Sequence, residues 1–149
     1  KVLYRECGLN GEVLGPQTYS FYYNQGVRAF LSRDLSLAEA YFQEAIRLDA
    51  AQLDAHFNLG LTYYRKREYA SAAEAWLVGT GLKAADASVF YHRGVALYRL
   101  DEPMKAARMF REAIKLDNQH NRAKKWLKVV DPKNQTRPKR QRRRWRQKR

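Results

Sequence analysis

Histidine, cysteine and clustered acidic residues are the side chains that could give this chain catalysis or a metal site. The sequence has three histidines, His56, His92 and His120, and a single cysteine, Cys7. The histidines form no metal-ligand spacing with a carboxylate or with the cysteine. The glycines recur at a fixed interval and form no phosphate-binding loop. We therefore expect no metal, no cofactor and no enzymatic activity, and one cysteine cannot form an intrachain disulfide.

The C-terminal residues indicate a second chemistry, the binding of anions. Of the 29 lysines and arginines, ten lie in residues 133–149, which contain no acidic residue, and the formal net charge of the chain is +14. Arginine forks match the geometry of phosphate, and Trp145 could stack on a base or lie at a lipid interface. The candidate anion-binding or nucleic-acid-binding residues are Lys139, Arg140, Arg142, Arg143, Arg144, Trp145, Arg146, Lys148 and Arg149.

Three interpretations of this basic segment are open. It is similar to arginine-rich RNA-binding peptides and to nuclear import signals, which favours nucleic acid or an acidic protein as its partner. It also suits an anionic membrane surface. The third interpretation is a solvated tail without a specific ligand, because any dense basic run produces the same similarity. Alone the segment buries too little apolar surface to fold, so a flexible tail is expected.

A repeat of 34 residues organises the rest of the chain. Small and large residues recur in register: Gly26, Gly60 and Gly94; Ala38, Ala72 and Ala106; Phe42, Trp76 and Phe110. Glycine in a helix costs about 1 kcal/mol relative to alanine, so its return at one place predicts a close approach of two helices. Each period contains two apolar-periodic stretches, such as residues 53–65 and 69–82, and is therefore predicted to be a helix pair.

These residues resemble the tetratricopeptide repeat, whose pattern is W-x-x-L-G-x-x-Y followed by A-x-x-x-F. The second period matches it best, with His56-x-x-Leu59-Gly60-x-x-Tyr63 and then Ala72-x-x-x-Trp76. His56 takes the usual tryptophan place and is predicted to be a packing residue. The proline that usually closes the pattern is absent. Over residues 19–118 the resemblance implies an all-α, right-handed helical-repeat solenoid of three helix pairs, completed by a C-terminal capping helix.

The predicted boundaries follow from the period. Residues 1–18 are a leader outside the repeat, residues 19–52, 53–86 and 87–120 are the three repeats, residues 121–131 are the capping helix, and residues 132–149 are the basic tail. A terminal repeat needs a cap, and Trp126, Leu127 and Val130 have the helical spacing to supply one. No stretch has the length and hydrophobicity of a transmembrane helix or a secretory signal. The compartment stays undetermined.

The resemblance implies that the first helix of each repeat lines a concave groove. Mapped by the 34-residue period, the groove positions form aromatic rows with a polar row beside them. The candidate groove residues are Tyr23, Asn24, Val27, Phe30, Phe57, Asn58, Leu61, Tyr64, Arg65, Tyr91, His92, Tyr98 and Arg99. Aromatic anchors and amides suit a docked peptide or helix. The alternative is that these aromatic residues, at helical spacing, belong to the core.

One use of this family is argued against. Its chaperone-tail binders clamp a terminal carboxylate with lysine, arginine and asparagine side chains, and here the matching places hold Tyr23, Val27, Asn58, Ser88 and His92, of which only Asn58 agrees. We therefore expect a protein-binding scaffold or assembly factor that docks a peptide or helix in its groove and contacts an acidic partner through its tail. The alternatives are a nucleic-acid-binding protein that acts through the tail, and a structural subunit of a larger complex.

Overall fold

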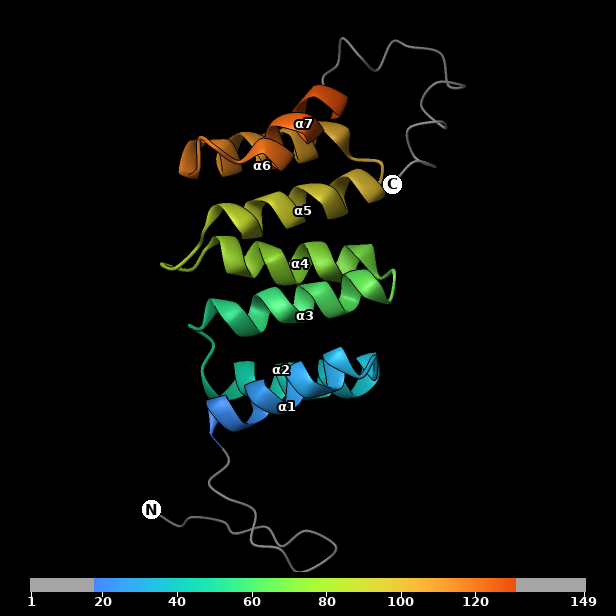
Figure 1. The fold of residues 1–149 in the computed structure, drawn as a ribbon, viewed down its shortest axis with the longest axis vertical. Helices are drawn as coiled ribbons and strands as arrows, with labels where there is room; N and C mark the ends of the chain where they lie inside the picture. The colour runs from blue at the N-terminus through green and yellow to red at the C-terminus, as the bar shows by residue number, and fades with distance from the viewer. Residues whose placement is uncertain (1–17, 131–149) are drawn as a thin grey trace, which may run out of the picture. The chain divides into compact units, whose positions relative to one another are not determined.

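The computed structural model describes residues 18–130, which form seven helices and no strand (Figure 1). The helices are α1 (Tyr19–Leu31), α2 (Leu35–Leu48), α3 (Leu53–Arg65), α4 (Tyr69–Thr80), α5 (Ala87–Arg99), α6 (Pro103–Leu116) and α7 (Asn121–Val130). The helices α1, α3, α5 and α7 begin 34 residues apart. This part of the chain is an all-α helical-repeat solenoid. The expected leader, up to residue 17, and the basic tail lie outside the described residues.

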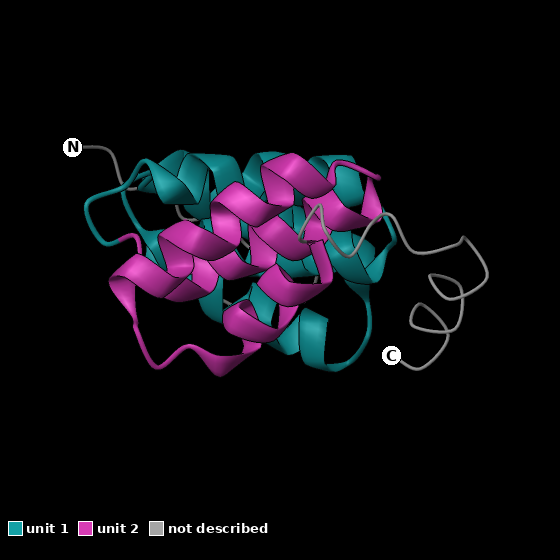
Figure 2. Cartoon of the chain, turned by 90° about the horizontal axis from the view of Figure 1, so that it is seen from above, with its two compact units in different colours: residues 1–84 teal, residues 85–149 magenta. Residues whose placement is uncertain are grey.

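The helices divide into two compact units, which Figure 2 shows in teal and magenta. The first unit contains α1 to α4, and within it α1 packs on α2, α2 on α3, and α3 on α4. The second unit contains α5 to α7, with α5 packed on α6 and α6 on α7. The division falls at residues 84 and 85, between the second and third helix pairs.

Each helix pair is closed by a glycine that faces an aromatic ring. A Cβ atom built on Gly26 would lie 2.7 Å from the ring of Phe42, and one on Gly94 would lie 2.7 Å from the ring of Phe110. On Gly60 it would lie 2.5 Å from Cε2 of Trp76, whose side chain is fully buried. Real Cβ atoms do not approach so closely, so only glycine lets the two helices meet. The close approach predicted from the repeated glycines is confirmed.

The turn inside each helix pair contains a left-handed residue that is not glycine. Arg33, Arg67 and Asp101 have φ values of 66°, 64° and 64°, and they are 34 residues apart. Around Arg67, the Glu68 N–H donates to the Tyr63 carbonyl at 2.9 Å while the Arg67 N–H donates to the Tyr64 carbonyl at 3.0 Å. This Schellman pattern satisfies the last carbonyls of α3. The same two bonds recur after α1 and α5.

Aspartates close the turns between pairs where the family pattern has proline. The Oδ1 atom of Asp49 accepts a hydrogen bond from the Ala51 N–H at 3.0 Å, and Oδ1 of Asp117 accepts one from the Gln119 N–H at 2.9 Å. Such Asx turns mimic a backbone turn. They fix the chain direction after α2 and α6, so the proline is not needed there.

His56 is a packing residue, as predicted. Its side chain is buried at 6% relative exposure, and its Nε2 atom lies 2.9 Å from the carbonyl oxygen of Ala50. Because a carbonyl only accepts, Nε2 carries the proton and donates. The bond ties the beginning of α3 to the turn that precedes it.

Ion pairs and hydrogen bonds join α2 to α3 across the repeat boundary. Lys66 Nζ lies 2.7 Å from Glu39 Oε2 and 2.9 Å from Glu68 Oε1. The Tyr63 hydroxyl donates to Glu39 Oε1 at 3.2 Å and accepts from Gln43 Nε2 at 3.1 Å. The two acids raise the pKa of Lys66 above its ordinary value, mainly through these hydrogen bonds. Because the group is close to solvent, the network fixes geometry more than it adds stability.

The short helix α7 covers the end of the second unit. Ala123 and Val130 are fully buried, whereas its lysines are exposed. Trp126 stacks on Phe110, with ring centroids 5.8 Å apart and an interplanar angle of 19°. Its indole also meets Tyr98 edge-on at 4.9 Å. The helix therefore completes the aromatic packing around Phe110.

Substitutions at Gly60 test the glycine-to-ring packing. We expect Gly60→Ala to destabilise the protein by about 1–3 kcal/mol through overpacking against Trp76, although alanine favours a helix by about 1 kcal/mol. Gly60→Leu should cost more. Trp76→Ala should cost roughly 3–5 kcal/mol through the cavity it leaves.

Gly81→Ala is the matched control, because the nearest atom to its built Cβ is the Val78 carbonyl oxygen at 3.5 Å. Denaturant unfolding followed by circular dichroism gives each free energy of unfolding. Equal stability of Gly60→Ala and Gly81→Ala would contradict the packing described.

Arg67→Gly tests the left-handed turn residue. A side chain in this conformation costs about 1–2 kcal/mol, and glycine removes that cost while losing about 0.4–1 kcal/mol through a freer unfolded chain. We expect a net gain of up to about 1 kcal/mol, measured as a higher Tm. The same substitution at Arg111, an exposed residue inside α6, should instead lower Tm. A lower Tm for Arg67→Gly would show that the arginine side chain is needed in the turn.

Candidate functional site

Two side-chain pairs join α1 to α3 in the first unit. Asn58 Nδ2 donates a hydrogen bond to the Tyr23 hydroxyl oxygen at 3.0 Å. Two helical turns further on, the guanidinium of Arg65 lies over the Phe30 ring, 3.9 Å from its centroid, and Nη1 lies 3.4 Å from the Phe30 carbonyl oxygen. A cation at this distance is attracted by the ring. The four side chains hold the outer surfaces of the two helices together.

Aliphatic side chains lie between these pairs. Val27 and Leu61 are half-buried, and Val27 packs against the first unit's core. Tyr23, Val27 and Phe30 follow the i, i+4, i+7 spacing of one helix face. We call the surface made by Tyr23, Asn24, Val27 and Phe30 of α1 and by Asp54, Asn58, Leu61 and Arg65 of α3 the α1–α3 face. Its residues are exposed or half-buried, and none is fully buried.

Asp54 supplies the negative end of the α1–α3 face. It is exposed in the first turn of α3. Burial and the Asp54 charge raise the pKa of Tyr19 to about 12 and also raise that of Tyr23. The two tyrosine rings stack with centroids 5.7 Å apart and an interplanar angle of 12°. Both phenols therefore remain protonated in the physiological range and act as neutral hydrogen-bonding groups.

Phe57 and Tyr64, the other candidate groove residues of α3, contact α4. The Phe57 ring lies 6.4 Å from Trp76, and the Phe57 carbonyl accepts a hydrogen bond from Trp76 Nε1 at 3.1 Å. Tyr64 meets Tyr69 edge-on, with centroids 5.1 Å apart, and lies 6.1 Å from Trp76. Both are half-buried. They therefore combine packing on α4 with a partly accessible edge.

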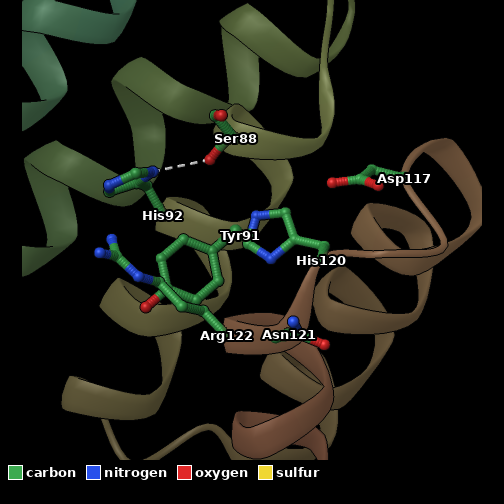
Figure 3. A pocket seen from close by; sticks show the side chains of 7 residues that line it. All are labelled: Ser88, Tyr91, His92, Asp117, His120, Asn121 and Arg122. Atoms are coloured by element: carbon green, nitrogen blue, oxygen red, sulfur yellow. Dashed lines mark hydrogen bonds between the residues drawn. The ribbon is translucent and has the colours of Figure 1, made fainter.

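In the second unit, Tyr91 and His92 line a cavity of about 310 Å³ (Figure 3). The other lining residues are Ser88, Asp117, His120, Asn121 and Arg122. The Tyr91 ring lies 4.9 Å from His120 and 5.0 Å from His92. The cavity is therefore bordered by α5, by the turn after α6 and by the beginning of α7.

Hydrogen bonds fix the proton positions of the two histidines in this cavity. His92 Nδ1 lies 2.7 Å from the Ser88 carbonyl oxygen, so Nδ1 carries a proton. His120 Nδ1 accepts a hydrogen bond from the Ala123 N–H at 3.1 Å and thereby caps α7. A neutral His120 therefore has its proton on Nε2. Protonating Nδ1 of His120 would remove the cap acceptor.

The remaining candidate residues of α5 lie toward its C-terminal end. Arg99 is exposed in the last turn. Tyr98 is half-buried and contacts Trp126 of α7. The structure thus brings Tyr98 to α7, whereas Tyr91 and His92 lie together at the cavity. The anion-binding residues predicted at 139–149 lie outside the described residues.

Three contributors to these surfaces, Tyr19, His120 and Trp126, were not among the predicted site residues. The 34-residue period carries the signal for two of them. Trp126 is the next member of the row Asn24, Asn58 and His92, and His120 follows Asp86 as the residue that caps a first helix. Tyr19 has no such signal, because its proximity to Asp54 depends on how α1 packs beside α3.

The described residues contain no cluster of histidine, cysteine and acidic side chains that could hold a metal ion. Within the same range, no helix combines the length and the hydrophobicity needed to cross a bilayer.

His92 gives a pH-dependent stability that can be measured. Burial lowers its pKa from the ordinary value of 6.5, and Arg122 and His120 lower it further, against the effect of the Ser88 carbonyl. The unfolded chain therefore binds more protons near and below pH 6.5 than the folded chain. Stability is present above that pH and is lost as the pH falls toward the folded-state pKa.

We expect the free energy of unfolding to fall between pH 7 and pH 5, and His92→Asn to reduce the fall. Denaturant titrations at three pH values give the slopes, and His56→Asn is the matched histidine variant outside the cavity. An unchanged slope in His92→Asn would mean that His92 does not favour its neutral form on folding.

The comparisons with known proteins agree with the repeat. Residues 14–78 match the tetratricopeptide repeat family. No curated protein sequence matches the chain.

Among solved structures, the TPR domain of Arabidopsis OM64 is similar with a TM-score of 0.70 and 21% identity, over 76% of this chain and 93% of that one. The Yersinia enterocolitica type III secretion chaperone SycD, in complex with a peptide of the translocator YopD, has a TM-score of 0.72 and 17% identity, over 76% and 92% of the two chains. The first TPR of Spaghetti (RPAP3), bound to the HSP90 peptide SRMEEVD, has a TM-score of 0.72 and 16% identity, over 78% and 93%.

At these identities the likeness concerns the fold. The family match, the helix pairs that begin at 34-residue intervals and the glycine-to-ring contact in every pair agree with one another. The chain is a tetratricopeptide repeat protein.

Proposed function

We propose that the chain is a protein-binding scaffold that docks a peptide or helix on the outer faces of its first helices. The observation that carries the proposal is the α1–α3 face. There, half-buried aromatic rings, amides and an arginine are held at fixed spacing by two rigid helices. Aromatic anchors with nearby hydrogen-bonding groups are typical of peptide-binding surfaces.

Two similar structures support a protein partner. SycD was solved with a translocator peptide, and the Spaghetti (RPAP3) domain with an HSP90 peptide. The tetratricopeptide repeat is a protein-interaction fold, in agreement with the expectation that this chain is not an enzyme. Its faces are built from neutral aromatic and amide groups more than from the cations that a carboxylate clamp needs.

A clamp on a terminal carboxylate is not part of the proposal. Of the five matching places, only Asn58 carries the expected side chain, and its amide already donates to the Tyr23 hydroxyl. Val27 and Tyr23 supply no positive charge. An isolated carboxylate would therefore lose its hydration at those places without an ionic partner.

The proposal includes a second, electrostatic contact through the basic C-terminal residues. The charge of residues 133–149 favours an acidic protein, nucleic acid or an anionic membrane surface as that second partner. The alternative function makes this contact the primary one and the repeats a recruiting module. A structural subunit with a permanently filled groove is the other alternative.

The face can be tested by comparing what variants retain from a lysate. We expect Asn24→Ala combined with Arg65→Ala to reduce recovery of protein partners by about tenfold, because interface hot-spot residues contribute about 1–2 kcal/mol or more. Both side chains are exposed, so folding should be little affected. Arg111→Ala on α6 is the matched control for loss of an exposed arginine. Unchanged recovery with the double variant would remove the α1–α3 face from the proposal.

The role of the basic residues is tested by ending the chain at Asp131. Protein partners that are kept after this truncation favour the scaffold, whereas nucleic acid that is lost with it favours the alternative. For the intact chain, binding to RNA or DNA through the basic residues should weaken linearly in log affinity against log salt, with a slope near 0.7 to 0.9 per neutralised phosphate. A flat salt dependence would exclude a polyphosphate partner.

A further inference from the structure

The α1–α3 face carries opposite charges at its two ends. Asp54 lies in the first turn of α3 and Arg65 is its last residue. Eleven residues of helix separate them, which is about 16 Å along the axis. Asp54, Asn58, Leu61 and Arg65 follow the i, i+4, i+7, i+11 spacing of one side of the helix. Both charged side chains are therefore presented on the surface proposed for docking.

The charges lie beside the pairs that join α1 to α3. The Asp54 charge raises the pKa of the Tyr19 and Tyr23 phenols, so the carboxylate lies at the tyrosine end of α1. Arg65 lies over Phe30 near the opposite end of α1. Among the described residues, neither Asp54 nor Arg65 is part of a salt bridge. Each charge is therefore available to a ligand at its own end.

The middle of the face favours an extended peptide over a helix. Asn24 is exposed and lies one residue from Tyr23, beside the Asn58 amide. Asparagine amides can pair with a peptide backbone only where that backbone has unsatisfied groups, and a helical ligand satisfies its own. Val27 and Leu61 then provide an apolar surface for one side chain.

We propose that the α1–α3 face binds an extended peptide with a basic, an apolar and an acidic side chain at alternate positions. Alternate side chains of an extended chain point the same way and are about 6.6 Å apart. Two such steps span about 13 Å, and the flexible stems of lysine and arginine cover the rest of the distance. The basic side chain pairs with Asp54, the apolar one rests on Val27 and Leu61, and the acidic one pairs with Arg65. This inference rests on the proposed function, because it names the ligand of the same surface.

The test uses two capped peptides of equal composition and opposite order, Lys-Ser-Leu-Ser-Glu and Glu-Ser-Leu-Ser-Lys, with the full chain. Binding is measured by NMR titration of the isotope-labelled protein, which detects weak affinities. A peptide can run along the face in either direction, so its backbone contacts decide which of the two peptides binds better. Two exposed ion pairs contribute about two- to thirty-fold in affinity together. We expect the preferred peptide to lose that factor with Asp54→Asn combined with Arg65→Gln.

A charge exchange makes the test specific. In the double variant Asp54→Lys with Arg65→Glu, the preference between the two peptides should reverse, and high salt should weaken both preferences. Exchange of the exposed pair Glu74→Lys and Arg111→Glu, which lies outside the face, is the matched control and should change nothing. Thermal unfolding of every variant shows that the fold is kept.

Each outcome separates the inference from the proposed function. Equal binding of both peptides, unaffected by the exchange, would overturn the charge order and leave the docking face standing. Failure of both peptides to shift the signals of α1 and α3 would overturn the extended, charge-ordered peptide as the ligand of this face. In that case the proposed function is still decided by the recovery of partners with the Asn24 and Arg65 variants.

Discussion

The contact between a helical glycine and a buried aromatic ring is the constraint on which the rest of the structure depends. It recurs as Gly26 on Phe42, Gly60 on Trp76 and Gly94 on Phe110. Each contact sets the distance between the two helices of a pair, because no side chain separates the ring from the glycine backbone. That distance decides which residues of the first helix face outward. The α1–α3 face in the first unit and the cavity residues on α5 in the second are both presented by first helices of this kind.

The fold could be predicted from the sequence because the same packing solution is written three times. The period located the helix pairs, and His56 and Pro103 have the packing and first-position roles that their places in the pattern predict. The turns were less accessible. Asp34 was predicted to cap α2, and it does, but the left-handed conformation of Arg33, Arg67 and Asp101 has no local signal. A glycine is the usual residue there, and the bonds that enforce the turn come from the helix already formed.

The candidate site was predictable as positions but not as contacts. The period placed Tyr23, Asn58, Phe30 and Arg65 on outward faces, whereas their pairing across α1 and α3 requires the distance between two helices that belong to different repeats. Trp126 shows the same limit. Its row in the period could have been extended from His92, yet its stacking on Phe110 depends on how α7 turns back over α6. Local patterns specify faces, and tertiary packing specifies which faces meet.

The position of α7 has a consequence for the order in which the protein forms during synthesis. A growing chain emerges N-terminus first, and domains fold largely as they appear. All four helices of the first unit precede residue 85, so that unit has its full set of internal contacts while the second is still incomplete. Phe110 and Tyr98, in contrast, wait for Trp126 to arrive from further along the chain. During that interval their rings are the part of the nascent second unit most in need of a chaperone.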